Sequence, residues 1–173
     1  PEPVILNGPF KGMRYLSESV GSILAPKILG AYEVELAAIT EACCSDAPGV
    51  VLDVGAAEGY YAVGMAWRCP NAKVIAFEAE ESGRRLLTQL AAMNGVSDRV
   101  EINGFCGHDI FLNVLQTQKP RLVIMDIEGG ESVLLSEAAV KHLGQTELLV
   151  ELHPWAAPGI EEALIKRFQI SHK

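Results

Sequence analysis

A glycine-containing turn carries the residues with the clearest chemical potential. The apolar run Val50–Val54 contains Asp53 and leads into Gly55, Ala56, Ala57, Glu58 and Gly59, before an expected helix. A strand, a tight glycine turn and a helix in this order let a nucleotide-like ligand approach the backbone. The pyrophosphate of a dinucleotide disfavours carboxylates in such a turn. Because Asp53 and Glu58 flank it and the spacing is G-x-x-x-G, the turn favours a positively charged ligand without phosphates.

S-adenosylmethionine fits this description, since it carries a sulfonium and an ammonium group. Glu78 ends the next apolar run, and an acid about 20 residues beyond the glycine turn can accept hydrogen bonds from both ribose hydroxyls. Two alternatives stay open: Glu58 could be a first-turn acid favoured by the helix dipole, and Glu78 a surface residue at a strand end. The residues expected to contact the cofactor here are Asp53, Gly55, Ala56, Glu58, Gly59, Tyr60, Glu78 and Ala79, and Asp126 is expected to join them from a later apolar run.

A second group of candidates follows two later apolar runs. Asp126 and Glu128 come after one run, and His153 comes after the next. Methyl transfer to a hydroxyl requires loss of the hydroxyl proton, so Asp126 or His153 could be a general base. The three side chains could instead hold a divalent metal through oxygen and nitrogen ligands. In the alternative reading, Glu128 and Glu131 are first-turn acids and His153 simply ends a strand.

The elements that must position these residues alternate between apolar runs and helical patterns. This alternation predicts a mainly parallel sheet with helices on both faces, and hence an α/β fold. Residues 1–30 have no sustained period and are expected to form an irregular arm, with residues 31–173 as the main domain. The expected strands are 50–54, 73–77, 99–103, 121–127 and 147–152, with a possible sixth at 169–172. The expected helices are 31–44, 59–68, 80–93, 109–117, 131–143 and 160–168.

Composition narrows the class of protein. The 173 residues suit one domain, and the formal net charge of −8 argues against nucleic acid as a partner. No signal segment or membrane-spanning apolar run is seen, and four cysteines without a C-x-x-C pair fit free thiols in the cytoplasm. The chain begins with Pro1, so we expect it to be part of something longer. The oligomeric state is not addressed by the sequence.

Four motifs in order resemble the FkbM family of methyltransferases. They begin at Asp53 (DVGAAEGYY), Ala76 (AFE), Asp126 (DIEGGE) and Val150 (VELHP), and the resemblance covers roughly residues 30–155. It implies a Rossmann-like class I methyltransferase fold with strand order 3-2-1-4-5 followed by a final pair of strands. It also implies S-adenosylmethionine as cofactor and a hydroxyl oxygen, often on a sugar or natural product, as methyl acceptor. By the same resemblance, Glu33 lies near the methionine end of the cofactor, and residues from Cys106 to Asp109 line the adenine.

The chain departs from the family pattern in three respects. Ile124 stands where the family commonly has a lysine, Ala57 stands where it often has asparagine, and the final strands are missing. We therefore expect an S-adenosylmethionine-dependent O-methyltransferase acting on a small molecule. The alternative is a cofactor-binding domain with weak catalysis and a partner or regulatory role. The charges of the turn and the missing G-x-G argue against a nicotinamide-dependent oxidoreductase.

Overall fold

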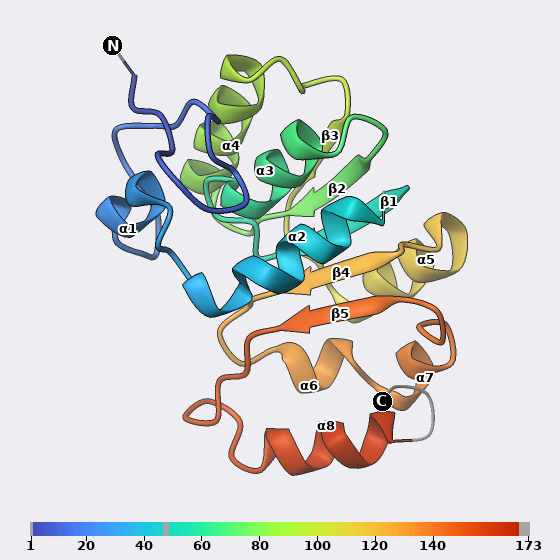
Figure 1. Cartoon of the computed structure of the whole chain (residues 1–173). Helices are drawn as coiled ribbons and strands as arrows, with labels where there is room; N and C mark the ends of the chain where they lie inside the picture. The colour runs from blue at the N-terminus through green and yellow to red at the C-terminus, as the bar shows by residue number, and fades with distance from the viewer. Residues whose placement is uncertain (1, 47–48, 170–173) are drawn as a thin grey trace.

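Five parallel strands form one sheet in the computed structural model, which describes residues 2–46 and 49–169 (Figure 1). The order across the sheet is β3-β2-β1-β4-β5, and each neighbouring pair is parallel. The strands are β1 (Val50–Val54), β2 (Lys73–Phe77), β3 (Val100–Asn103), β4 (Leu122–Met125) and β5 (Glu147–Val150). This arrangement confirms the expected α/β fold. Since the strand order reverses beside β1, a ligand crevice is expected at the carboxyl ends of β1 and β4.

Helices cover both faces of the sheet (Figure 1). Alternate side chains of a strand point to opposite faces, so Val51 joins the apolar layer beneath α2 to α4, whereas Leu52 joins the layer beneath α5 to α8. The helices are α1 (Leu24–Leu29), a 3₁₀ turn (Val34–Leu36), α2 (Ala37–Ser45), α3 (Tyr60–Arg68), α4 (Glu81–Met93), α5 (His108–Gln118), α6 (Glu131–Leu134), α7 (Glu137–Val140) and α8 (Ile160–Phe168).

The segment before α2 is packed into the core. Phe10 and Tyr15 are fully buried, and the Phe10 ring meets the ring of Tyr60 edge-on at a centroid distance of 5.2 Å. The prediction of an irregular arm is wrong for Leu24–Leu29, which forms α1. Pro26 concealed this helix from pattern analysis, but it stands in the first turn, where the missing N–H has no intrahelical partner.

Two of the expected helices also differ from the prediction. The helix expected at residues 31–44 begins at Ala37, after a 3₁₀ turn. The single helix expected at 131–143 is instead α6 and α7, because Ser136 interrupts it and its hydroxyl accepts a hydrogen bond from the Ala139 N–H at 3.3 Å. The possible sixth strand at 169–172 falls almost wholly outside the described residues.

Candidate functional site: an acidic cavity at the sheet edge

A cavity of about 980 Å³ opens at the carboxyl ends of β1 and β4. It is large enough for a nucleoside-sized ligand with space to spare. Among the described lining residues, the basic side chains are Lys27 and His108. The acidic lining residues are Glu33, Glu35, Asp53, Glu78, Glu80, Asp126, Glu128 and Glu151. Such a wall attracts cations and repels phosphates.

The glycine turn brings two walls of the cavity together. Gly55 has φ 91°, and a Cβ added there would lie 1.7 Å from the carbonyl oxygen of Asp126. The backbone N–H groups of Gly55 and Ala56 donate to the carbonyl of Phe77 at 2.9 and 3.0 Å. A side chain at Gly55 would therefore push the turn after β1 away from the segment after β4, so glycine is required there.

Glu78 lies on the cavity wall with its carboxylate already oriented. One oxygen accepts a hydrogen bond from the N–H of Ala57 and the other from the N–H of Glu80, each at 2.7 Å. Each carboxylate oxygen has a further lone pair. Glu78 can thus accept two hydroxyl donors without moving, as the predicted ribose contact requires. That contact stays a prediction.

Glu58 lies outside the cavity lining, contrary to the expected cofactor contact. Its carboxylate is fully buried and accepts hydrogen bonds from Tyr15, Ser19, Val20 and Lys27, with the Lys27 Nζ at 2.5 Å. Burial raises the pKa of Glu58, but the bonds from Lys27 and Ser19 outweigh it and hold the pKa below its usual value. Because these donors use the carboxylate fully, Glu58 fastens the N-terminal segment to the domain.

Asp53 is a buried carboxylate on the cavity wall. It is 3% exposed, and its Oδ2 has no hydrogen-bond partner among the described residues. Burial and repulsion by Asp126 raise its pKa to about 7. A buried acceptor without a donor suits a cationic ligand or a proton.

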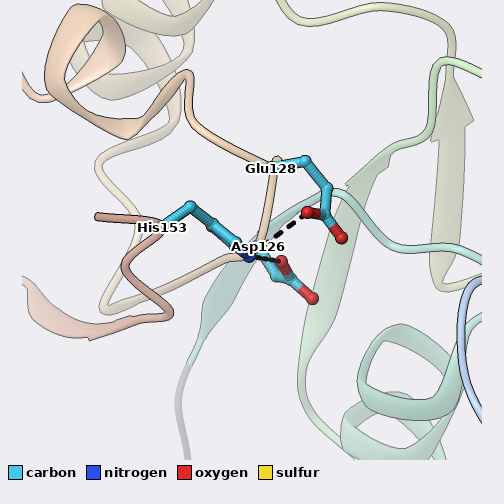
Figure 2. Close-up of side chains that lie close together, drawn as sticks. All are labelled: Asp126, Glu128 and His153. Atoms are coloured by element: carbon cyan, nitrogen blue, oxygen red, sulfur yellow. Dashed lines mark ion pairs between the residues drawn. The ribbon is translucent and has the colours of Figure 1, made fainter. Parts of the chain in front are cut away.

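Asp126, Glu128 and His153 meet where β4 and β5 end (Figure 2). The His153 Nε2 lies 3.5 Å from Asp126 Oδ1 and 3.5 Å from Glu128 Oε2. Asp126 and His153 therefore approach each other from the ends of β4 and β5, while their chemical role stays a prediction. Asp126 and Glu128 line the cavity, and His153 lies behind them, 6% exposed.

Glu131 orients the His153 ring. Its buried carboxylate accepts from the Nδ1 of His153 at 2.7 Å and from the N–H of Gly129 at 3.1 Å. Burial lowers the pKa of His153, but the bond to Glu131 and the neighbouring carboxylates raise it by more. Burial and the nearby Glu151 raise the pKa of Asp126 to about 6. The sequence identified Glu131 as a first-turn acid of the following helix, and nothing in its pattern indicated the contact with His153.

Some of the other residues predicted to contact the cofactor line the cavity, and others lie away from it. Glu33 lines the cavity, and its carboxylate accepts a hydrogen bond from the Tyr61 hydroxyl. Asp109 has a fully exposed side chain and is not among the lining residues; neither is Gly59, which caps α3. The other predicted contacts that line the cavity are Gly55, Ala56, Tyr60, Ala79 and Cys106.

Lys27 is a lining residue that sequence reasoning missed. It is 2% exposed and comes from α1, which was not expected as a helix. His108 falls in the range from Cys106 to Asp109 that the resemblance assigns to the adenine; it lines the cavity, and its Nε2 lies 2.8 Å from the Ser136 hydroxyl. Lys27 belongs to no motif whose spacing could have placed it there.

Solved structures with the same fold include proteins that bind S-adenosylmethionine. The O-methyltransferase TomG of Streptomyces achromogenes, involved in tomaymycin synthesis and solved with SAM, is 17% identical (TM-score 0.55; 90% of this chain and 70% of TomG covered). Cofactor-bound Rv0187 from MTB is 18% identical (TM-score 0.57; 76% and 65% covered). The Thermus protein TTHA0928 is 16% identical (TM-score 0.52; 86% and 80% covered). The fold is therefore the Rossmann-like fold of methyltransferases.

Comparison with protein families and with curated proteins gives no match. The chain covers 53% of a Klebsiella pneumoniae protein of this fold and 65% of Rv0187, so it spans about half to two thirds of these structures. Within residues 2–46 and 49–169, no helix combines the length and the apolar character needed to cross a membrane.

Proposed function

We propose that the chain is an S-adenosylmethionine-dependent O-methyltransferase of FkbM type that acts on a hydroxyl of a small molecule. The observation that carries the proposal is the acidic cavity at the sheet edge, with Glu78 oriented on one wall and Asp126 on another. A cofactor with two positive charges and a ribose matches that wall, whereas a dinucleotide would bring its phosphates against carboxylates.

The residues present fit this cofactor in three places. Glu78 would hold the ribose hydroxyls, and the backbone of the turn at Gly55 and Ala56 leaves room for close approach. Glu33 and Asp53 are carboxylates on the wall, and the Oδ2 of Asp53 lacks a donor that an ammonium group could supply. Cys106 lines the cavity on the side where the resemblance places the adenine. Bound there, S-adenosylmethionine supplies a methyl group on a positively charged sulfur.

The wall that carries Asp126 is proposed to remove the proton of the acceptor hydroxyl. An acceptor oxygen that takes the methyl group would displace the sulfur, which would keep the bonding electron pair. The acceptor would also lose its hydroxyl proton, and we assign the removal of that proton to Asp126, Glu128 and His153. Asp126 is partly exposed toward the cavity and has its pKa raised to about 6, which suits a proton acceptor near neutral pH.

The charge of the cavity also limits the acceptor. One wall is formed by Asp126, Glu128 and Glu151. Among the described residues, the basic side chain beside this wall is His153. Anionic acceptors, including nucleic acids, would be repelled by this wall. We therefore infer a neutral or cationic hydroxyl compound, such as a sugar or natural product.

A second candidate is a cofactor-binding domain without turnover. Ile124 favours it, because this buried side chain lines the cavity where the FkbM pattern commonly has a lysine. Transfer of labelled methyl from S-adenosylmethionine to a panel of hydroxylated acceptors separates the candidates. Turnover supports the transferase, whereas cofactor binding with no labelled product from the panel or from cell extract supports the binding domain.

Cofactor choice is tested first, by titration calorimetry with S-adenosylmethionine, S-adenosylhomocysteine and NADH. We expect the first two to bind and NADH to bind poorly. Tight NADH binding together with no binding of the methyl donor would overturn the proposal.

A further inference from the structure

The two ring nitrogens of His153 have different neighbours. Nδ1 lies 2.7 Å from a Glu131 oxygen, whereas Nε2 lies 3.5 Å from Asp126 Oδ1 and 3.5 Å from Glu128 Oε2 (Figure 2). Two carboxylates that converge on a buried ring nitrogen favour a positive charge among them. A proton on Nε2 supplies such a charge, and so does a bound cation that takes the place of that proton.

We propose that Asp126, Glu128 and His153 bind a divalent metal ion. Their three ligand atoms all lie within 4.8 Å of one another. Metal–ligand bonds of about 2.0–2.2 Å at tetrahedral angles place neighbouring ligand atoms about 3.4 Å apart. The observed separations of 3.5 Å from Nε2 to each carboxylate agree with this spacing.

Two further observations point to a missing ligand. The Asp126 Oδ1 is buried and has no hydrogen-bond partner among the described residues, although it faces the cluster. The His153 side chain is 8% exposed, and among the described contacts its Nε2 makes ion pairs but no hydrogen bond. Buried polar atoms are nearly always paired, and an unpaired one indicates a partner such as an ion.

The surroundings resemble those of a metal-binding histidine. Glu131 accepts the Nδ1 proton, which fixes the ring and directs Nε2 outward, as carboxylates behind histidine ligands do. One imidazole and two carboxylates suit Mn²⁺ or Zn²⁺ better than the all-oxygen ions Mg²⁺ and Ca²⁺. Asp126 and Glu128 are 42% and 72% exposed, so the remaining coordination positions face the cavity.

The consequence for chemistry rests on the proposed function. A cation on this wall would attract the acceptor hydroxyl and lower its pKa, so that the proton passes to water. Asp126 and His153 would then be ligands, and neither would need to accept the proton itself.

The first test measures Mn²⁺ binding by electron paramagnetic resonance, without cofactor or acceptor. We expect one Mn²⁺ per chain and an affinity lowered at least 10-fold in Glu128→Gln, whose side chain is mostly exposed and therefore spares folding. The matched control is Glu161→Gln on the exposed side of α8, which should bind as the unchanged protein does. Absence of Mn²⁺ binding, or equal affinity in Glu128→Gln, overturns the site.

The second test identifies the nitrogen ligand. Spin-echo measurements should show ¹⁴N coupling to bound Mn²⁺ in the unchanged protein and lose it in His153→Gln, with melting curves confirming that the variant is folded. Bound Mn²⁺ without ¹⁴N coupling in the unchanged protein overturns the assignment. Binding is measured without methyl transfer, so a metal-loaded protein lacking transferase activity counts against the proposed function alone. Transfer that persists undiminished in a chelator counts against the metal's catalytic role.

Discussion

Two carboxylate centres border the same sheet edge, and their surroundings differ sharply. Glu58 is fully buried and receives four donors, one of them the Lys27 ammonium. Asp126 is 42% exposed, faces two other carboxylates, and has a buried oxygen without any hydrogen-bond partner among the described residues. A carboxylate whose oxygens all accept hydrogen bonds from the protein stabilises the fold. A carboxylate oxygen without a donor from the protein is available to a ligand.

The largest effect is expected when the buried ion pair of Glu58 and Lys27 is broken. Glu58→Ala should lower the free energy of unfolding by about 3–5 kcal/mol, because it leaves the Lys27 ammonium buried without its partner. Urea unfolding measures the loss. The double variant Lys27→Met with Glu58→Leu is the control and should recover much of the stability, since no unpaired charge remains. A loss below about 1 kcal/mol in Glu58→Ala would place this pair with weak surface ion pairs.

Breaking the second centre should affect turnover instead. Asp126→Asn should reduce methyl transfer by about 10²-fold or more and leave cofactor affinity nearly unchanged, because it removes a charge needed for proton loss. Single-turnover rates and melting temperature are measured on one preparation. Lower stability with normal turnover of the folded fraction would show that Asp126 merely supports the loop. Full activity in both Asp126→Asn and His153→Ala would remove the case for a catalytic pair.

Glu78 is intermediate between Glu58 and Asp126 in the number of hydrogen bonds it accepts. Its carboxylate accepts two from backbone N–H groups and has further lone pairs for a ligand. Glu78→Ala should weaken S-adenosylhomocysteine binding by about 1–3 kcal/mol, the range for leaving ligand hydroxyls unpaired. Calorimetry gives the value, and Glu81→Ala, an exposed acid at the start of α4, is the matched control. Unchanged affinity in Glu78→Ala would mean that the ribose is held elsewhere.

The last comparison concerns the pH dependence of stability, which Asp53 controls without any bound ligand. The pKa of Asp53 is about 7 in the folded protein against the ordinary 3.8 of an aspartate, so the folded state binds this proton more tightly. Its contribution to stability is therefore present below pH 4 and is lost as the pH rises toward 7. Asp53→Asn should gain on the unchanged protein across that window, by about 3 kcal/mol for a shift of this size. Urea unfolding without cofactor at pH 4.5 and pH 7.5 measures it, and a constant difference would contradict the raised pKa.

The sequence predicted the position of a residue correctly where that position depends on a single strand or turn. The buried strands predicted a parallel sheet, and the resemblance implied its strand order. Glu78 and Asp126 line one cavity because the carboxyl ends of parallel strands meet at one edge. It misled for Glu58, whose partners come from a segment with no period of its own. The contact of Glu131 with His153 was also out of reach, since a short helix start and a strand end meet through tertiary packing alone.

The docking of the N-terminal segment has a consequence for synthesis of the chain. The backbone of Arg14 exchanges two hydrogen bonds with the Asn94 side chain, across 80 positions of sequence. At roughly 5–20 residues per second, the ribosome needs several seconds to deliver that partner. The N-terminal segment can pair with Glu58 earlier, but its contact with Asn94 forms only after α4 has been made.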